Sequence, residues 1–85
     1  MYINTAFSIH GHASIKLSDR ESEVLRLISH EYTTKQIAHT LYLSPHTVDT
    51  HKKNLKIKLD VKNTAGMVRR GFEIGILNPR SALSC

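Results

Sequence analysis

The sequence predicts an all-α fold, a bundle of four helices in a single domain. Two observations carry this expectation. Helix-capping residues stand just ahead of apolar residues at helical spacing in four places, and no segment shows the alternation that marks a strand. The 85 residues are enough for one small domain with one modest core, which we expect to be only marginally stable.

The first predicted helix opens at Ser18 and ends near His30. Glu21 follows Ser18 by three residues, the spacing of a capping box, in which each side chain bonds the backbone amide of the other residue. Leu17 stands just before the cap, where an apolar side chain can staple the start of the helix. Apolar residues then follow at helical intervals, at Val24, Leu25 and Ile28.

The second and third predicted helices lie close together in the chain. The second opens at Thr33 with Gln36 as its capping-box partner, and its apolar stripe consists of Ile37, Ala38 and Leu41. The third opens at Ser44, and Pro45 occupies the first helical position, where its missing N–H is no loss. Only residues 42–44 separate the two helices. This spacing predicts a helix-turn-helix, in which the second helix of the pair can lie in a DNA major groove.

The third helix, predicted from about Pro45 to Leu59, has two chemically different faces. Val48, Leu55 and Leu59 mark a buried line, and His51 lies beside it. The residues that point away are Asp49, Thr50, Lys53 and Lys56. A groove-reading helix needs one apolar face that holds it on the domain and an opposite face that bonds bases and phosphates, and this segment offers both. An ordinary solvated lysine face is the alternative reading of the same residues.

The fourth predicted helix follows Asn63 as its cap and ends near Gly75. Gly66 and Gly71 each weaken it by roughly 1 kcal/mol relative to alanine, unless they permit a close approach of another segment. Its apolar residues are Ala65, Met67, Val68, Phe72 and Ile76, of which we expect Met67, Val68 and Phe72 in the core. We assign residues 1–16 to an arm or linker, residues 17–77 to the domain and residues 78–85 to a C-terminal tail.

Charge and composition narrow the function classes. The formal net charge is +5, and it is concentrated in residues 33–85, which carry nine lysines and arginines against three acidic residues. A basic half of this kind suggests a polyanionic partner. No apolar run is long enough to span a membrane, and a single cysteine, Cys85, neither forms an internal disulfide nor builds a thiolate site, so we expect a cytoplasmic protein.

An enzyme finds little support in the sequence. We find no phosphate loop, no nucleophile elbow and no pair of carboxylates that can be placed together. His10 and His12 form an H-x-H pair in the predicted arm, and we expect neither a metal nor any other cofactor there.

Three motifs in order resemble the C-terminal effector domain of the LuxR family, the class shared with NarL- and FixJ-type response regulators. They are LSDRESEVL at the first helix, TTKQIAHTL at the second and SPHTVDTHKKN at the third. The resemblance covers roughly residues 17–77, and its specificity lies in the combination and spacing of the motifs. It implies a four-helix domain that binds double-stranded DNA as a homodimer and regulates transcription.

The resemblance also implies roles for particular residues. The positions that match the family's base readers are Asp49, Thr50 and Lys53. Contacts to the DNA backbone are expected at Thr33, Thr34, Lys35, Ser44, Thr47, His51, Lys52, Asn54 and Lys56. The fourth helix matches the family's dimerisation helix, which places Ala65, Arg69 and Arg70 near the subunit contact. RNA polymerase is a further candidate partner.

Some positions depart from the family pattern. Asp60 stands where a glycine usually ends the third helix, and aspartate tolerates the left-handed conformation at some cost. Asp49 stands where a basic residue is frequent. Lys56 and Ile57 reverse the usual order of apolar then basic, so Ile57 falls off the buried line. These departures affect which bases the third helix reads.

The fourth region of bacterial sigma factors offers an alternative function on a similar helix-turn-helix. Such a module works while attached to RNA polymerase, so a protein is its main partner. The LuxR-type motifs argue against this alternative. The two functions differ in the expected number of copies on a symmetric DNA site, two for the LuxR-type domain and one for the sigma-like module.

Overall fold

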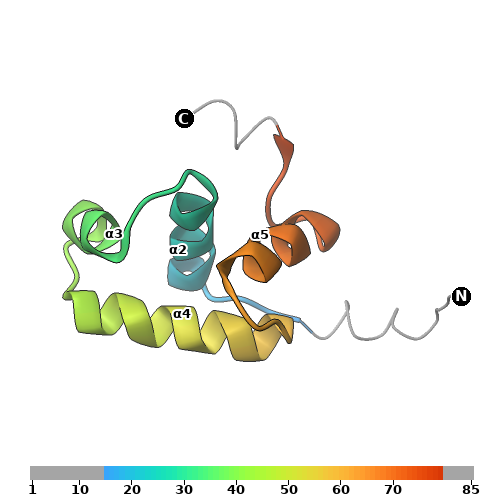
Figure 1. Ribbon diagram of the computed structural model, residues 1–85, viewed down its shortest axis with the longest axis horizontal. Coiled ribbons are helices and arrows are strands. Elements are labelled where there is room, and N and C mark those ends of the chain that lie inside the picture. The colour runs from blue at the N-terminus through green and yellow to red at the C-terminus, as the bar shows by residue number, and fades with distance from the viewer. Residues whose placement is uncertain (1–14, 80–85) are drawn as a thin grey trace, which may run out of the picture.

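The computed structural model describes residues 15–79, and within them the chain forms helices and no strand. This confirms the predicted all-α fold. The helices are α2 (Asp19–Ser29), α3 (Thr34–Leu41), α4 (Pro45–Leu59) and α5 (Thr64–Glu73). In Figure 1, α4 lies along the base of the bundle, with α3 above its start, α5 above its end and α2 between them. Residues 1–14 of the predicted arm, with His10 and His12, and residues 80–85 of the predicted tail, with Cys85, lie outside the described residues.

Each of these helices starts at the N-cap that the sequence predicts. Both predicted capping boxes are present, at the starts of α2 and α3. In the first, the Glu21 amide donates to Ser18 Oγ at 3.0 Å and the Ser18 amide donates to Glu21 Oε1 at 2.9 Å. The N-caps are Ser18, Thr33, Ser44 and Asn63. These bonds join residues three apart, which is why the sequence alone locates the helix starts.

Three helices end at left-handed residues other than glycine. The backbone φ is 67° at Glu31, 58° at Tyr42 and 56° at Asp60, after α2, α3 and α4. After α4, the Val61 amide donates to the Lys56 carbonyl at 3.0 Å, which closes the helix in a Schellman arrangement. Asp60 therefore ends α4 as a glycine would, as the sequence indicated.

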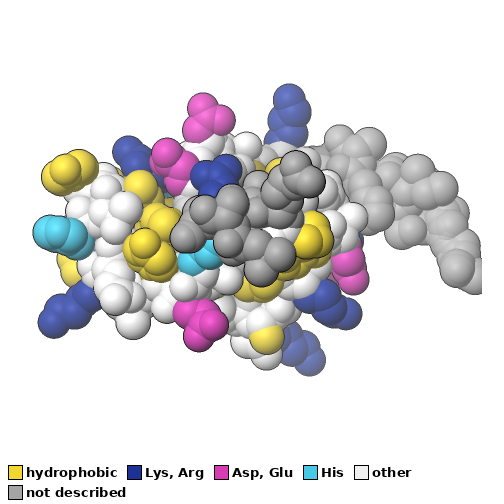
Figure 2. Space-filling model, turned by 90° about the horizontal axis from the view of Figure 1, so that it is seen from above, with side chains coloured by type: hydrophobic (Ala, Val, Ile, Leu, Met, Phe, Trp, Pro, Cys, Tyr) yellow, Lys and Arg dark blue, Asp and Glu magenta, His cyan; other side chains and the backbone are white. Residues whose placement is uncertain are grey.

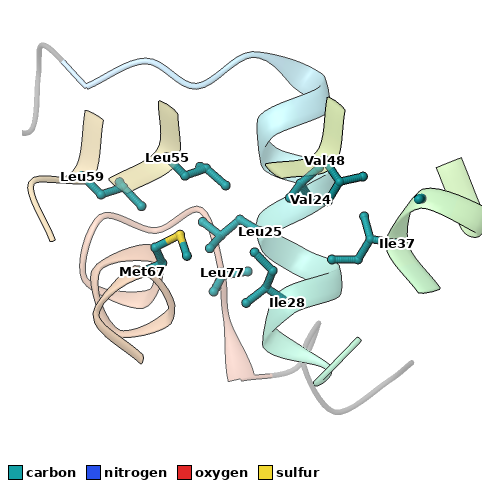
Figure 3. Close-up of a cluster of buried hydrophobic side chains, with 10 residues drawn as sticks. Val24, Leu25, Ile28, Ile37, Val48, Leu55, Leu59, Met67 and Leu77 are labelled. Carbon is teal, nitrogen blue, oxygen red and sulfur yellow. The ribbon is translucent and has the colours of Figure 1, made fainter. Parts of the chain in front are cut away.

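The core is centred on α2, which contacts all three other helices. Figure 3 shows Leu25 between side chains of α4 and α5, and Val24 beside Val48 of α4. Ile37 reaches this cluster from α3. The buried apolar side chains are Val24, Leu25, Ile28, Ile37, Ala38, Val48, Leu55, Leu59, Met67 and Leu77. Because α4 supplies three of them, the core fixes its orientation relative to the bundle.

The segment after α5 folds back over Gly71. A Cβ at this position would lie 2.8 Å from Leu77 Cδ1 and 3.1 Å from Leu25 Cδ2, so only glycine lets Leu77 pack here without displacement. The Leu77 amide also donates to the Gly71 carbonyl at 3.0 Å. The close approach that the sequence allowed at Gly71 is therefore present.

Some expectations for the fourth helix were wrong. Helix α5 ends at Glu73, so Ile76 lies beyond it, partly buried against the core. Phe72, expected in the core, is 37% exposed because α5 turns Met67 and Gly71 inward instead.

Ile15, which we assigned to the arm, packs against the core, so packing begins ahead of Leu17. Among residues 15–79, no helix is long and apolar enough to cross a membrane.

Candidate nucleic-acid interface

The connection between α3 and α4 is as tight as the sequence predicts. Tyr42 ends α3 in the left-handed conformation, and the Leu43 amide donates to the Ala38 carbonyl at 2.9 Å. Leu43 is half-buried against the core. The bend and this anchor together fix the direction in which α4 leaves α3, which is the geometry of a helix-turn-helix.

Helix α4 presents one face to the core and leaves the opposite face open. Val48, Leu55 and Leu59 are fully or almost fully buried. None of the other labelled helices lies beneath α4 in Figure 1. The exposed side chains opposite the buried line include Asp49, Thr50, Lys53 and Ile57. We call this surface the outer face of α4.

The three predicted base readers lie together on the outer face. Asp49, Thr50 and Lys53 line one shallow hollow of about 360 Å³, whose other walls are His46, Lys52 and Lys56. Within the described chain, no ion pair joins Asp49 to Lys53, so both charged ends remain available. The Thr50 hydroxyl donates to the His46 carbonyl at 3.2 Å, and its oxygen can still accept a bond.

A lysine of α4 meets the N-terminus of α3. Lys52 Nζ donates to Thr34 Oγ1 at 2.7 Å, and Lys52 is half-buried. The capping box of α3 engages the amides of Thr33 and Gln36. The amides of Thr34 and Lys35, in the first turn of α3, have no hydrogen-bond acceptor within the described chain. A positive charge at a helix N-terminus is unfavourable alone, and an anion at this place would meet both the ammonium and the amides.

The N-terminus of α4 is ordered by its own side chains. Ser44 Oγ accepts from the Thr47 amide at 3.0 Å and donates to Thr47 Oγ1 at 2.9 Å. Farther along, Asn54 is exposed on the flank of the helix and His51 is half-buried. The structure therefore places these predicted backbone-contacting residues around the outer face, on its rim.

Lys58 forms an ion pair within the described chain, unlike Lys53 and Lys56. Its Nζ donates to Glu21 Oε1 at 2.8 Å, and the Glu21 side chain is only 6% exposed. This ion pair ties the end of α4 to the start of α2. The sequence offered Glu21 only as a capping residue and did not indicate this pair, because the two residues lie 37 positions apart.

The pKa of the Glu21 carboxyl reflects two opposed effects. Burial raises the pKa and is the largest single effect. The hydrogen bonds from Lys58 and from the Ser18 amide and hydroxyl, with the attraction of the Lys58 charge, together outweigh it. The pKa therefore lies below its ordinary value of 4.5, and the ionised form is the one that the folded state favours.

Replacement of Glu21 with glutamine should lower the free energy of unfolding by roughly 1 kcal/mol at neutral pH, because the charged partner of Lys58 is lost. A group with a lowered folded pKa stabilises the fold above its unfolded pKa, and this stabilisation is lost as the pH falls through the folded value. The parent should therefore lose stability below about pH 4.5 more steeply than Glu21→Gln does.

Urea denaturation at a series of pH values measures both effects. Glu23→Gln is the matched control, because Glu23 pairs with Arg20 on the surface, where both side chains are more than 40% exposed. Its expected effect is within about 0.5 kcal/mol. Equal losses for the two variants would contradict a stabilising Glu21–Lys58 pair.

The predicted dimerisation residues divide between two environments on α5. Ala65 and Arg69 are exposed and lie four residues apart, so they share one face of the helix. Arg70 is less accessible and donates to Glu73 Oε1 at 3.3 Å. Ala65 and Arg69 therefore form an open surface, which Arg70 only borders.

Charge is distributed differently on the face that lies opposite α4. Figure 2 looks from above, from the side opposite the base on which α4 lies, and shows basic, acidic and apolar side chains interspersed. Helix α4 itself carries four lysines and one acidic residue. Within residues 15–79, no group of three histidine, cysteine or acidic side chains could hold a metal ion. The positive charge of α4 together with its open outer face defines a helix-turn-helix of the DNA-binding class.

Comparison with known proteins agrees with this class. The family "Bacterial regulatory proteins, luxR family" matches residues 16–70. The chain is 42% identical over 62 residues to "Transcriptional regulatory protein MctR" of Rhizobium johnstonii, and 41% identical over 61 residues to "Uncharacterized response regulatory protein YgeK" of Escherichia coli K12. It is 39% identical over 62 residues to "Oxygen regulatory protein NreC" of Staphylococcus haemolyticus. No solved structure matches significantly.

The chain belongs to the LuxR family of bacterial regulatory proteins. This confirms the resemblance drawn from the sequence motifs, and it makes the chain a DNA-binding domain of transcription regulation. The matched segments are 72–73% of this chain, but only 29% of the Rhizobium and Staphylococcus proteins and 42% of the Escherichia coli protein. The chain therefore corresponds to less than half the length of these relatives.

Proposed function

We propose that this chain binds double-stranded DNA in a sequence-specific manner, as the effector domain of a response-regulator type of protein in the cytoplasm. The observation that carries the proposal is the outer face of α4, an open surface on which Asp49, Thr50 and Lys53 stand side by side. The Escherichia coli relative is named a response regulatory protein, which supports the response-regulator assignment.

The outer face supplies the groups that base edges require. A lysine at the position of Lys53 bonds O6 and N7 of guanine. These are the two acceptors that guanine displays in the major groove at a G·C base pair. The Asp49 carboxylate accepts from the N4 amine of cytosine, and the Thr50 oxygen accepts from an exocyclic amine. These three residues set the sequence preference in the proposed complex.

The rim of the outer face supplies phosphate contacts. The amides of Thr34 and Lys35, which have no acceptor within the described chain, and the ammonium of Lys52 offer a phosphate donors from two helices. Contacts of this kind position the domain on the duplex and carry no sequence information directly. The residues to which we assign them are Thr33, Thr34, Lys35, Ser44, Thr47, His51, Lys52, Asn54 and Lys56.

Two copies associate through α5 in this proposal. The open surface of Ala65 and Arg69, bordered by Arg70, supports it, because a two-fold contact needs an accessible patch that meets itself. Such a dimer places two α4 helices in successive major grooves, about one helical turn apart. Contact with RNA polymerase would then come from surfaces other than the outer face of α4.

The test uses a duplex enriched from a random library by the protein itself. Sedimentation of the complex at rising protein concentration gives the number of copies per duplex. Two copies on a two-fold symmetric sequence would support the proposal, whereas one copy on an asymmetric sequence is what a sigma-like module predicts. Uniform affinity for all duplexes would contradict sequence-specific binding.

Replacement of Lys52 with alanine should weaken binding to every duplex by a similar factor, because Lys52 meets a phosphate rather than a base. The loss of one phosphate contact should reduce the slope of log affinity against log salt by about 0.9. Affinity titrations of an enriched and a scrambled duplex at several salt concentrations measure both effects.

Thr34→Val is the companion variant for this prediction. It removes the hydroxyl that accepts from Lys52 Nζ and keeps every charge. The salt slope should then remain as in the parent while the affinity for both duplexes falls slightly. A change in sequence preference on Lys52→Ala would refute the assignment of Lys52 to a phosphate.

A further inference from the structure

Ile57 is an apolar side chain on a surface that is otherwise polar. It is 76% exposed, so it contributes little to the core. It lies four residues after Lys53 and seven after Thr50, the spacings that keep side chains on one face of a helix. Ile57 therefore extends the line of the proposed base readers by one further turn.

A single exposed apolar residue is common on protein surfaces and needs no special explanation by itself. Two observations distinguish Ile57. Its side chain projects from the outer face of α4, the surface assigned to the groove, and the fold does not need it, because Leu55 and Leu59 on either side make the core contacts. Ile57 is also apolar, whereas the proposed base readers Asp49, Thr50 and Lys53 are all polar.

We propose that Ile57 recognises a thymine through the 5-methyl group in the major groove, an inference that rests on the proposed sequence-specific binding. The thymine methyl is the apolar group that base pairs display in this groove, and aliphatic side chains contact it. Four helical residues advance roughly 6 Å along α4. The thymine should therefore lie within about two base pairs, each with a rise of roughly 3.4 Å, of the base that Lys53 bonds.

The size of the effect follows from one methyl group. Burial of a methyl against an aliphatic side chain changes the affinity about three- to fivefold, and it adds no charge to the interface. The effect should therefore be independent of salt concentration, in contrast to that of the lysines. The effect should appear as a preference for thymine at one base pair of the site.

Substitution of deoxyuridine for thymine tests the contact directly, because it removes the 5-methyl and keeps every hydrogen-bonding group. The duplex is one that the parent protein enriches from a random library, with each thymine replaced in turn. Fluorescence anisotropy then gives the affinities of the parent and of Ile57→Ala at constant salt. Ile57→Val, which keeps the branched side chain, is the conservative control.

The parent should lose about three- to fivefold in affinity at one thymine, and Ile57→Ala should show no loss there. Ile57→Val should still show most of the fall in affinity that the parent shows when this thymine is replaced. The sensitive thymine should stand within about two base pairs of the position at which Lys53→Ala relaxes the preference. An equal loss for the parent and Ile57→Ala, or an enriched sequence with no thymine at that distance, would overturn the inference.

The outcomes separate this inference from the function on which it rests. A parent that enriches a defined sequence, with a deoxyuridine profile unchanged by Ile57→Ala, refutes the role of Ile57 alone. A parent that enriches no sequence refutes specific binding, and the role of Ile57 with it. Urea denaturation excludes misfolding as a cause, since Ile57→Ala removes an exposed side chain.

Discussion

Replacement of Lys53 with alanine should weaken binding to an enriched duplex by roughly 1–3 kcal/mol, which is about 5- to 150-fold in affinity. Lys53 is exposed at the centre of the outer face of α4 and forms no ion pair within the described chain. Its ammonium is therefore available to a guanine edge. The sequence preference should relax at the base pair that Lys53 contacts and remain elsewhere.

Lys62→Ala is the matched control for this prediction. Lys62 is an exposed lysine in the turn between α4 and α5, so its loss removes the same charge away from the outer face. The control should change the affinity for all duplexes alike and by less. Competition between the enriched duplex and variants changed at single base pairs measures the preference. If Lys53→Ala ranks these variants as the parent does, Lys53 has no reading role.

Replacement of Leu25 with alanine should lower the free energy of unfolding by roughly 2–5 kcal/mol. Leu25 is completely buried on α2, and its Cδ2 lies against the backbone of α5 at Gly71. The glycine has no side chain that could move into the cavity. A domain of this size has little stability to spare, so a substantial unfolded population is expected.

Ile57→Ala provides the contrast for Leu25→Ala, since it removes a branched aliphatic side chain that is 76% exposed. Its stability should stay within about 0.5 kcal/mol of the parent. Urea denaturation followed by circular dichroism measures both variants. A loss below about 1 kcal/mol for Leu25→Ala would show that the α2–α5 contact adjusts to fill the cavity.

The helix starts and the turn between α3 and α4 were predictable from the sequence because they depend on near neighbours. A cap joins residues three apart, as Ser18 and Glu21 do, and the bend occupies residues 42–44. The outer face of α4 was predictable for the same reason. The apolar line at Val48 and Leu55 marks the buried side of the helix, so the opposite side is left to solvent.

The environments of the charged residues were less accessible to sequence reasoning. Lys52 and Lys58 both belong to α4 and differ little in the sequence, but one bonds Thr34 and the other bonds Glu21. Which partner each lysine meets depends on how α4 crosses α2 and α3. For the Lys58–Glu21 pair, the sequence offered one signal, which is that the capping residue Glu21 is acidic.

By itself, the sequence determined which segments are helical, where each helix starts, the bend before α4 and the side of α4 that faces away from the core. These features follow from hydrogen bonds and apolar spacings within a few residues of each other. Only the tertiary structure decided that Leu77 folds over Gly71, that Phe72 is 37% exposed rather than buried and that Glu21 pairs with Lys58. The physical reason is that these contacts join distant segments, so they depend on helix crossings that no local pattern specifies.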